Sequence, residues 1–457
     1  MNFHALLSEI NAIVWGPITL CLLVGTGLYL TLRLRLIQIF KLPLALRLLF
    51  KPASGQGDLS SFAALCTALS ATIGTGNIVG VATAIKIGGP GALFWMWLAA
   101  FFGMATKYGE CMLALKYRTT DARGNIAGGP MYYIERGLGL GWLAKLFALF
   151  GVGVAFFGIG TFAQVNAISD AMTIAFHVPA WVTALVLTLL VAAVTLGGVK
   201  RIAKVAQKLV PSMALGYVLA CLWILVTFSE QIIPALQLVI HSAFSPISAA
   251  GGFLGATVAQ AIQIGIARGV FSNESGLGSA PIAAAAAKTK EPVEQGLVSM
   301  TGTFFDTLLI CTMTGLVLII TGVWSGDAAG AAMTSAAFAT GGSAVIGQYL
   351  VTIALVCFAF TTILGWHYYG ERCWYYLTGH KLGERGIKIY QFIFLSLIAL
   401  GAFIQLDLIW LLADTVNGLM AIPNLIALIG LRKVIIADTL SYFATRDSQG
   451  TQQELTA

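Results

Sequence analysis

The sequence predicts an all-α integral membrane protein with about 11 transmembrane helices, two of which are broken near the middle of the membrane. Two observations support this fold class. Hydrophobic residues make up 58% of the 457 residues and charged residues only 10%, whereas soluble proteins average about 25% charged residues. In addition, glycine-rich polar segments interrupt two of the apolar stretches, at residues 74–77 and 268–278. In a membrane, a helix can be broken only where the freed backbone lines an enclosed cavity.

A helix needs about 20 apolar residues to cross the hydrocarbon core. By this criterion the expected spans are, in order, residues 11–32, 59–85, 92–115, 142–176, 180–196, 209–228, 251–286, 296–323, 344–369, 387–404 and 408–431. The first is long enough to span and has no basic segment before it, so we expect an uncleaved helix rather than a signal peptide. The polar residues 445–457 are expected to be disordered.

Lysine and arginine are concentrated in alternate loops. They follow the odd-numbered spans, as with Arg33 and Arg35 after the first span and Lys200 and Arg201 after the fifth, and Lys86 is the one clear exception. The positive-inside rule places these loops in the cytoplasm, the N-terminus outside and the C-terminus inside. The same distribution argues against a nucleic-acid partner despite a net charge of +7, because the basic residues do not share one face.

Spans two to six and seven to eleven form two sets of five, and each set opens with a broken helix. Because five is odd, the second set must have the opposite orientation in the membrane, as in the inverted repeats of secondary transporters. We therefore expect an extra N-terminal helix with a basic loop (residues 1–58), a first repeat (59–228), a second repeat (250–436) and a cytoplasmic tail (437–457).

The first break combines glycines with polar side chains. Gly74 and Gly76 allow the backbone to leave helical geometry. The outer half-helix begins near Asn77, so its N-terminal N–H groups face the gap and suit a carboxylate. Thr75 and Asn77 can add hydrogen bonds, and the carbonyls freed near Ile73 suit a cation. The alternative is that the glycines only permit close helix packing, but polar groups inside a membrane favour a functional site.

The second break, residues 268–278, is richer in polar groups. Phe271 could wall off a small ligand, and Ser272 and Asn273 could contact its polar end. Arg268 and Glu274 are costly inside a membrane unless each has a partner. They could pair across the unwound turn or with other helices, and we interpret them mainly as a gate or a structural pair.

Two other spans carry candidate ligands. Thr361 and Thr362 are adjacent in the ninth span. Hydroxyls in a helix often bond back to the preceding turn, but together with the freed carbonyls of the second span they could equally coordinate sodium, a hard cation that prefers oxygen. In the fourth span, Gln164 could reach the cavity, whereas Asn166 and Asp170 are i, i+4 neighbours that can satisfy each other.

Three further charged residues lie in apolar spans. Lys107 and Glu110 are i, i+3 neighbours, so we expect a local ion pair. Asp306 has no local partner, and it could join a polar network or line an ion path. The sequence contains no zinc-protease, nucleophile-elbow or nucleotide-binding motif, so neither an enzyme nor ATP-driven transport is supported. The seven cysteines form no C-x-x-C pair and are interpreted as small buried hydrophobic residues.

Four motifs carry a family resemblance that covers nearly the whole chain: GTGN at 74–77, GGPGALFWMW at 88–97, GGPMYY at 128–133 and FSNESGLGS at 271–279. Together they resemble the alanine/glycine:cation symporters. The resemblance implies a leucine-transporter-like fold of ten core helices in a five-plus-five inverted repeat, here preceded by one extra helix. It also implies sodium-coupled uptake of alanine or glycine across the inner (plasma) membrane of a prokaryotic cell, with no cofactor other than the coupling ion.

The resemblance also implies site residues. Sodium would meet backbone oxygens of Ser70, Ile73 and Phe358 and the hydroxyls of Thr361 and Thr362. Ser70 stands where that ion site usually has glycine, but it supplies the same carbonyl. The substrate would contact Thr75, Gly76, Asn77, Gln164, Gly269, Phe271, Ser272 and Asn273.

The sequence also allows comparison with two alternatives to sodium symport, proton coupling and a channel. Proton coupling on the same fold usually needs a titratable group at the ion position, such as a lysine in the sixth span, which residues 212–227 lack. Asp306 and Glu274 keep this alternative open. A channel is disfavoured, because two alternately gated breaks do not form a continuous pore. Alanine, glycine and larger neutral amino acids all stay open as substrates, as does the oligomeric state.

Overall fold

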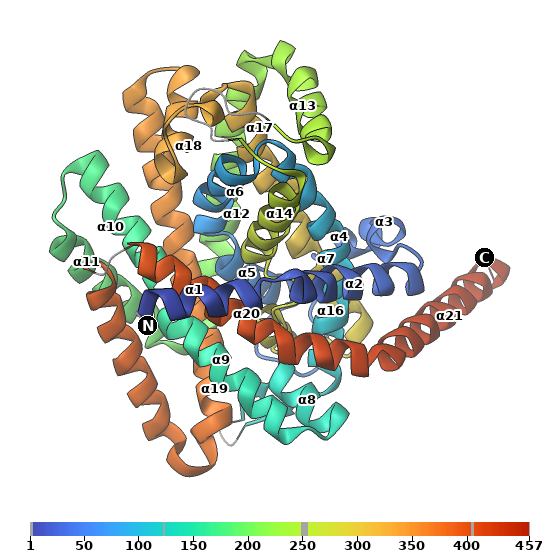
Figure 1. Cartoon of the computed structure of the whole chain (residues 1–457). Coiled ribbons are helices and arrows are strands. Elements are labelled where there is room, and N and C mark those ends of the chain that lie inside the picture. The colour runs from blue at the N-terminus through green and yellow to red at the C-terminus, as the bar shows by residue number, and fades with distance from the viewer. Residues whose placement is uncertain (1–2, 122–123, 248–254, 404–405, 457) are drawn as a thin grey trace.

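The computed structural model describes residues 3–121, 124–247, 255–403 and 406–456, and these are mostly helical (Figure 1). By length and composition, six of the described helices could cross a membrane, or seven if one pair bent by 54° counts as a single span. The bent pair, Ser61–Thr72 and Gly76–Gly88, is the expected second span with its break. The all-α membrane class is therefore confirmed.

The N-terminal region and the first expected repeat contain α1 (Phe3–Val14), α2 (Pro17–Arg33), α3 (Ile37–Phe40), α4 (Leu42–Leu48), α5 (Ser61–Thr72), the π-helical turn η1 (Gly76–Gly80), α6 (Val81–Gly88), α7 (Gly91–Lys116), the antiparallel strands β1 (Thr119–Thr120) and β2 (Ile126–Ala127), α8 (Pro130–Leu138), α9 (Gly141–Phe157), α10 (Phe162–Phe176), α11 (Ala180–Thr195) and α12 (Gly198–Thr227).

The connection and the second expected repeat contain η2 (Ser229–Gln231), α13 (Ile232–Phe244), α14 (Val258–Asn273), α15 (Ala280–Ala284), α16 (Pro292–Thr303), the π-helical segment η3 (Phe304–Cys311), α17 (Thr312–Ile320), η4 (Val323–Ser325), α18 (Gly330–Thr340), α19 (Ala344–Gly401), α20 (Leu406–Gly430) and α21 (Arg432–Thr456). The expected starts of the seventh span and of the second repeat, at residues 251 and 250, lie outside the described residues, as does the expected end of the tenth span at residue 404.

Several boundaries differ from the expectation. The first span is interrupted between α1 and α2, where Pro17 opens α2 and leaves no N–H for a continuous helix. The fourth span is two helices, α9 and α10. The ninth and tenth spans share the label α19 but are two helices, which meet at a kink at Gly383, where φ +50° and ψ −128° are non-helical angles that glycine adopts readily. The third, fifth, seventh and tenth expected spans are largely helical but do not pass the length and apolarity test alone; α11, for example, has only 16 residues.

The expectation of a disordered tail was wrong. Residues 445–456 continue α21, which projects away from the body of the molecule (Figure 1). The start of this helix is anchored, because Ile435 is buried and Thr439 Oγ1 lies 2.6 Å from the hydroxyl of Tyr108. The rest contains no proline, and its glutamine, glutamate and leucine residues favour helix even without packing.

The two broken helices lie side by side in the interior. The π-helical turn η1 and α6 pack against α14, and η1 also meets η3, while α5 packs against α15. Around them, α7 packs on α14, α15 and α16, and α19 packs on α5, α9 and α10. Both breaks are therefore shielded from lipid by continuous helices, as unpaired backbone in a membrane requires.

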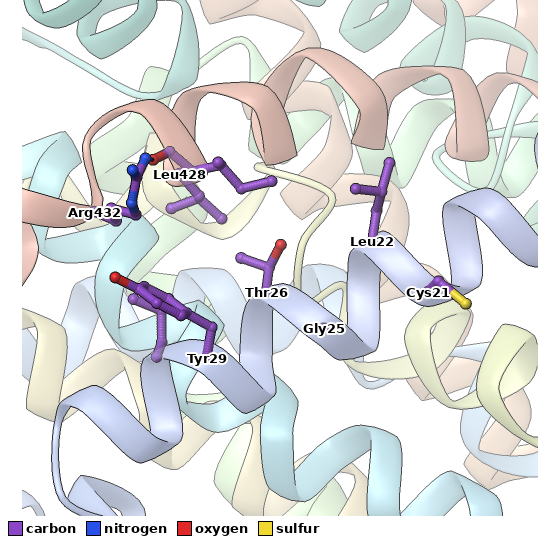
Figure 2. Close-up of a pocket in the computed structure, with 9 residues that line it drawn as sticks. Cys21, Leu22, Gly25, Thr26, Tyr29, Leu428 and Arg432 are labelled. Atoms are coloured by element: carbon purple, nitrogen blue, oxygen red, sulfur yellow. Dashed lines mark hydrogen bonds between the residues drawn. The ribbon is translucent and has the colours of Figure 1, made fainter.

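Outside this centre, α1 and α2 run along α20. Trp15 Nε1 donates to the carbonyl of Asp414 at 2.8 Å, which fixes the turn between α1 and α2 on α20. Further along, α2 and α20 border a mainly apolar groove of about 270 Å³, with Arg432 at one end (Figure 2).

Candidate functional site

The first break is held open by side chains rather than by helix bonds. α5 ends at Thr72, and Ile73 has an extended backbone with φ −74° and ψ 94°. Asn77 Oδ1 accepts from the N–H of Gly74 at 2.9 Å, which replaces a helical partner. Gln164 of α10 binds Thr75 twice, accepting from its N–H at 3.3 Å and donating to Oγ1 at 3.1 Å. The break is therefore a defined loop, and Gln164 reaches it as expected.

Both glycines of the break lie where another element approaches closely. A Cβ added to Gly74 would overlap Thr362 Oγ1, and it would lie 3.4 Å from Gln164 Oε1. A Cβ on Gly76 would lie 3.1 Å from the Cα of Ser272, on the other broken helix. The glycines thus allow α19 and α14 to reach the unwound backbone.

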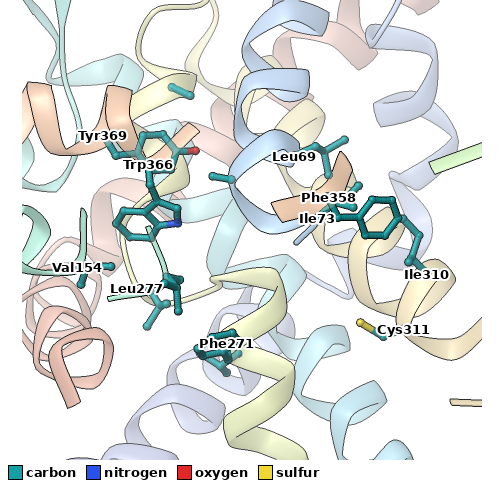
Figure 3. Close-up of a cluster of buried hydrophobic side chains, with 14 of the residues drawn as sticks. Leu69, Ile73, Val154, Phe271, Leu277, Ile310, Cys311, Phe358, Trp366 and Tyr369 are labelled. Carbon is teal, nitrogen blue, oxygen red and sulfur yellow. The ribbon is translucent and has the colours of Figure 1, made fainter. Parts of the chain in front are cut away.

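Four of the five residues expected to hold sodium meet at one point. Thr362 Oγ1 lies 3.3 Å from the carbonyl of Ile73 and 3.1 Å from that of Phe358, and Thr361 Oγ1 lies 2.9 Å from the carbonyl of Phe358. Figure 3 shows Ile73 and Phe358 next to each other in the same buried region. Both hydroxyls bond back to the preceding turn of their own helix, as hydroxyls in helices often do. Thr362 also contacts the carbonyl of Ile73, which is freed at the break.

Ser70 is fully buried near the same end of α5, and its hydroxyl donates to the carbonyl of Thr67 at 2.7 Å; the group expected to meet sodium is its backbone carbonyl.

The side chain of Asp306 accepts hydrogen bonds from three residues. Thr307 is a local partner, which was not expected, whereas Asn77 and Ser272 belong to other elements. The carboxylate Oδ1 accepts from Asn77 Nδ2 at 2.8 Å, and its Oδ2 accepts from Ser272 Oγ at 2.8 Å and Thr307 Oγ1 at 2.7 Å. Asp306 belongs to the π-helical segment η3. The carboxylate thus ties both broken helices to η3, and the polar-network interpretation is the one that the structure supports.

The expected start of the second break was wrong: α14 stays helical as far as Asn273, so the break begins at Glu274 and the residues from Arg268 to Asn273 are helical. Phe271 lies near Gly76, whose added Cβ would be 3.4 Å from the Phe271 ring, and it packs on Trp410 with ring centroids 5.6 Å apart. Asn273, in contrast, donates to Thr307 Oγ1 at 3.1 Å. Gly269 faces α7, where an added Cβ would lie 3.3 Å from the Cα of Met96. The α-carbon of Gly269 therefore faces α7 and not the first break.

Arg268 and Glu274 do not pair with each other. Arg268 forms a two-pronged ion pair with Asp414 of α20, at 3.1 and 2.7 Å, and its guanidinium lies 5.4 Å from the ring of Phe271. Glu274 ends α14 with a left-handed φ of +56° and accepts from Trp366 Nε1 at 2.9 Å and from the hydroxyl of Ser279. Because α14 stays helical as far as Asn273, it separates the two side chains along its length.

The expected ion pair between Lys107 and Glu110 is also absent from the described contacts. Glu110 instead accepts from Asn424 of α20, which also donates to the carbonyl of Gly276 at 2.9 Å. Lys107 Nζ is buried and has no hydrogen-bond partner among the described residues. A partner from another helix therefore outcompetes the local i, i+3 neighbour.

Sequence reasoning missed Asp414, Trp366 and Asn424. The signals were weak: Asp414 is a charge in the eleventh span, and Trp366 lies one helical turn after Thr362. Their partners are 92 to 314 residues away in the chain. No local pattern could identify these pairs.

The whole group is closed to solvent. Thr75, Asn77 and Thr361 have no exposed surface, and the exposed fractions of Gln164 and Phe271 are 2% and 4%. In this low-dielectric interior, the freed N–H and carbonyl groups can exchange their present partners only for a ligand of complementary polarity. A small zwitterion and a cation would each have suitable partners here.

Comparison with known proteins gives concordant results. The model of the sodium:alanine symporter family matches residues 1–457. The chain is 63% identical to an uncharacterized transporter of Haemophilus influenzae over 97% of each chain. It is 51% identical to the sodium/alanine symporter AgcS of Methanococcus maripaludis, over 98% of this chain and 99% of that protein. Among solved structures it resembles MhsT in complex with L-phenylalanine, with a TM-score of 0.52 and 13% identity over 85% of this chain and 99% of MhsT. At that identity the likeness concerns the fold, which is leucine-transporter-like.

Proposed function

The chain belongs to the sodium:alanine symporter family, and from this premise we propose that it takes up alanine, glycine or both by sodium-coupled symport with alternating access. Family membership makes it a membrane transporter and not an enzyme. The observation that carries the proposal is the contact between the two broken helices and α19 in a closed interior. There, Thr362 reaches the carbonyl freed at Ile73, while Gln164 holds the neighbouring Thr75.

In this proposal the sodium ion is coordinated by oxygens of Ser70, Ile73, Phe358, Thr361 and Thr362. Sodium prefers several oxygen ligands, and the carbonyl of Ile73 has no helical partner because the backbone turns away from α5. Binding of the ion at this point links α5 to α19, which gives sodium a preference for one arrangement of these helices. Such a preference is what couples an ion to a conformational change.

The substrate in this proposal contacts Thr75, Gly76, Asn77, Gln164, Gly269, Phe271, Ser272 and Asn273. The N–H groups that begin η1 suit its carboxylate, and the carbonyls at the second break suit its ammonium group. Gly269 would act through its backbone alone, since its α-carbon packs on Met96. A Cβ added to Gly76 would lie only 3.4 Å from the ring of Phe271, so the space between these two residues is narrow. A substrate with a small side chain is therefore favoured over one with a large side chain.

We also propose the two inverted repeats at residues 59–228 and 250–436, and an orientation with the N-terminus outside and the C-terminus in the cytoplasm of a prokaryotic cell. The basic residues of alternate loops support this orientation. The relatives' names support sodium coupling. Proton coupling is less favoured, although Asp306 would be the titratable group to test.

The experiment is uptake of labelled alanine into proteoliposomes under an imposed sodium gradient, compared with an imposed proton gradient. We expect sodium alone to drive accumulation above equilibrium, and we expect Thr362→Ala to weaken activation by sodium more than it changes amino-acid preference. Uptake driven only by protons would reject sodium coupling and direct attention to Asp306. Unchanged sodium dependence in Thr362→Ala would reject the ion site.

A further inference from the structure

The GGPMYY motif at residues 128–133 plays no part in the site described above, yet it lies where the two broken helices end. The segments before α5 and after α15 pair through their main chains. Leu59 bridges to Ala287 in parallel, the N–H of Leu59 donates to the carbonyl of Ala286 at 3.0 Å, and the N–H of Lys288 donates to the carbonyl of Leu59 at 2.6 Å. At this end, which we predict to be cytoplasmic, the two broken helices are therefore joined.

Arg118 fastens this junction to the end of α7. Its guanidinium donates to four main-chain carbonyls: Nη1 to Ala285 at 3.0 Å and Ala287 at 2.7 Å, and Nη2 to Gln56 at 2.8 Å and Thr289 at 3.1 Å. Carbonyls beyond a helix end lack helical partners, and the fixed fork of an arginine can bind several of them at once. None of the ion pairs between described residues includes Arg118. Its bonds to these carbonyls are thus its main polar contacts.

The glycines of the motif let the loop between α7 and α8 lie flat on α15. A Cβ added to Gly128 would overlap the Cβ of Ala285, and one added to Gly129 would lie 2.8 Å from Ile282 Cγ1. Gly129 also has a φ of +119°, which side chains rarely adopt. On the other side, the N–H of Ile126 donates to Asp58 Oδ2, just before α5, at 2.9 Å. The same loop therefore holds both broken helices.

We propose that Arg118 is a positioning residue that keeps the inner side of the transporter closed, with Gly128 and Gly129 bringing the loop close enough for it to act. This inference rests on the alternating access proposed above, in which release of substrate to the inside requires α5 and α15 to leave the α7–α8 loop. One side chain binds carbonyls of the segment before α5 and of the segment after α15, so its release frees both helices together. Removing it shifts the population toward the state that is open on this side.

The test uses the chain's own cysteines. Cys111 of α7 is buried against Ala280 and Ala284 of α15, so it becomes accessible to N-ethylmaleimide when α15 moves away. For Arg118→Gln in the full-length protein we expect modification of Cys111 at least roughly tenfold faster than in the wild type, the ratio produced by losing about one net hydrogen bond to a charged donor. Lys116→Gln is the matched control, because Lys116 ends the same helix but pairs with Asp438 of α21. We expect its rate to equal that of the wild type.

A second variant reaches the same contact differently. Gly128→Ala adds a Cβ that pushes the loop off Ala285, so it should also accelerate modification of Cys111, whereas Gly141→Ala, with no atom within 4 Å of the added Cβ, should not. Arg118→Lys keeps the charge and three donors, and it should restore part of the slow rate.

Three results would overturn the proposal. The first is a wild-type rate at Cys111 in both Arg118→Gln and Gly128→Ala. The second is equal acceleration at the buried Cys221 and Cys373, which would indicate general loosening of the fold. The third is no rescue by Arg118→Lys together with acceleration in Lys116→Gln. The labelling requires no substrate, so its failure is separable from a failure of the proposed alanine transport.

Discussion

Replacing Gly74 with alanine tests the ion site through its geometry. The new Cβ would overlap Thr362 Oγ1 and lie 3.3 Å from Thr362 Cβ, which is shorter than the ordinary carbon–carbon contact distance of about 3.5–4.0 Å. Since Gly74 is held by Asn77, the hydroxyl of Thr362 must turn away. It then loses its contacts with the carbonyls of Ile73 and Phe358.

The expected weakening of sodium activation is calculated from the loss of those two contacts. Each hydrogen bond contributes about 0.5–1.5 kcal/mol, so the loss is about 1–3 kcal/mol, which corresponds to a weakening of sodium activation by roughly 5- to 150-fold. The assay is initial alanine uptake in proteoliposomes at a series of sodium concentrations. Gly80→Ala is the matched control, because Gly80 lies in η1, the π-helical turn that follows Gly74, and the nearest neighbour of its new Cβ is 4.0 Å away.

A double variant makes the reasoning refutable. Once Thr362 is alanine, no hydroxyl is left for the new methyl group to displace, so Gly74→Ala combined with Thr362→Ala should be no worse than Thr362→Ala alone. Such non-additivity is the mark of two residues acting through one contact. Additive effects of the two changes, or normal sodium activation in Gly74→Ala, would show that Thr362 does not act at this point.

Three further outcomes are expected. Gln164→Ala removes both bonds to Thr75 and should raise the alanine concentration for half-maximal uptake by roughly 5- to 10-fold; an unchanged value would remove Gln164 from the substrate site. Asp306→Asn replaces an acceptor of three bonds with a poorer one and should cut uptake at least roughly tenfold, with sodium still the driving ion in gradient assays; proton-driven residual uptake would contradict this. Gly296→Ala places a Cβ 2.8 Å from the carbonyl of Tyr108 and should destabilise the protein by about 1–3 kcal/mol in thermal unfolding, whereas Gly216→Ala, in open space, should not; equal melting of the two would refute the packing argument.

The presence of the helices and of the two breaks follows from local chemistry, and so the sequence predicts them, although the interruptions before Pro17 and after Phe157 were not predicted. Gly74 and Gly76 mark the first break, and Gly276 and Gly278, which have φ of +89° and +82°, mark the second. The contact of Thr362 with the carbonyl freed at the first break could be predicted as well, because two adjacent hydroxyls in an apolar helix stand out in the sequence. A disordered tail was wrongly expected, since polarity alone does not prevent a chain without proline from remaining helical.

Pairings between distant helices could not be predicted. Asn77 and Asp306 are 229 residues apart, and their contact depends on how η1 packs against η3. Glu110 illustrates the opposite error, in which a local partner was expected and a residue 314 positions away was found. In a membrane protein with few charges, each charge is satisfied by whichever helix brings a partner within reach, and only tertiary packing decides which one that is.

The π-helical turn η1 makes the length of the chain part of the site. A π-helical turn contains an additional residue compared with an α-helical one, and each residue of a helix turns the chain by about 100°. Deleting Ile78, Val79 or Gly80 would therefore turn Asn77 and Thr75 relative to α6 and away from Asp306 and Gln164, although every polar side chain of the site would still be encoded. In comparisons among homologous genes, a gap in this segment should be a stronger sign of lost transport than most amino-acid exchanges within it.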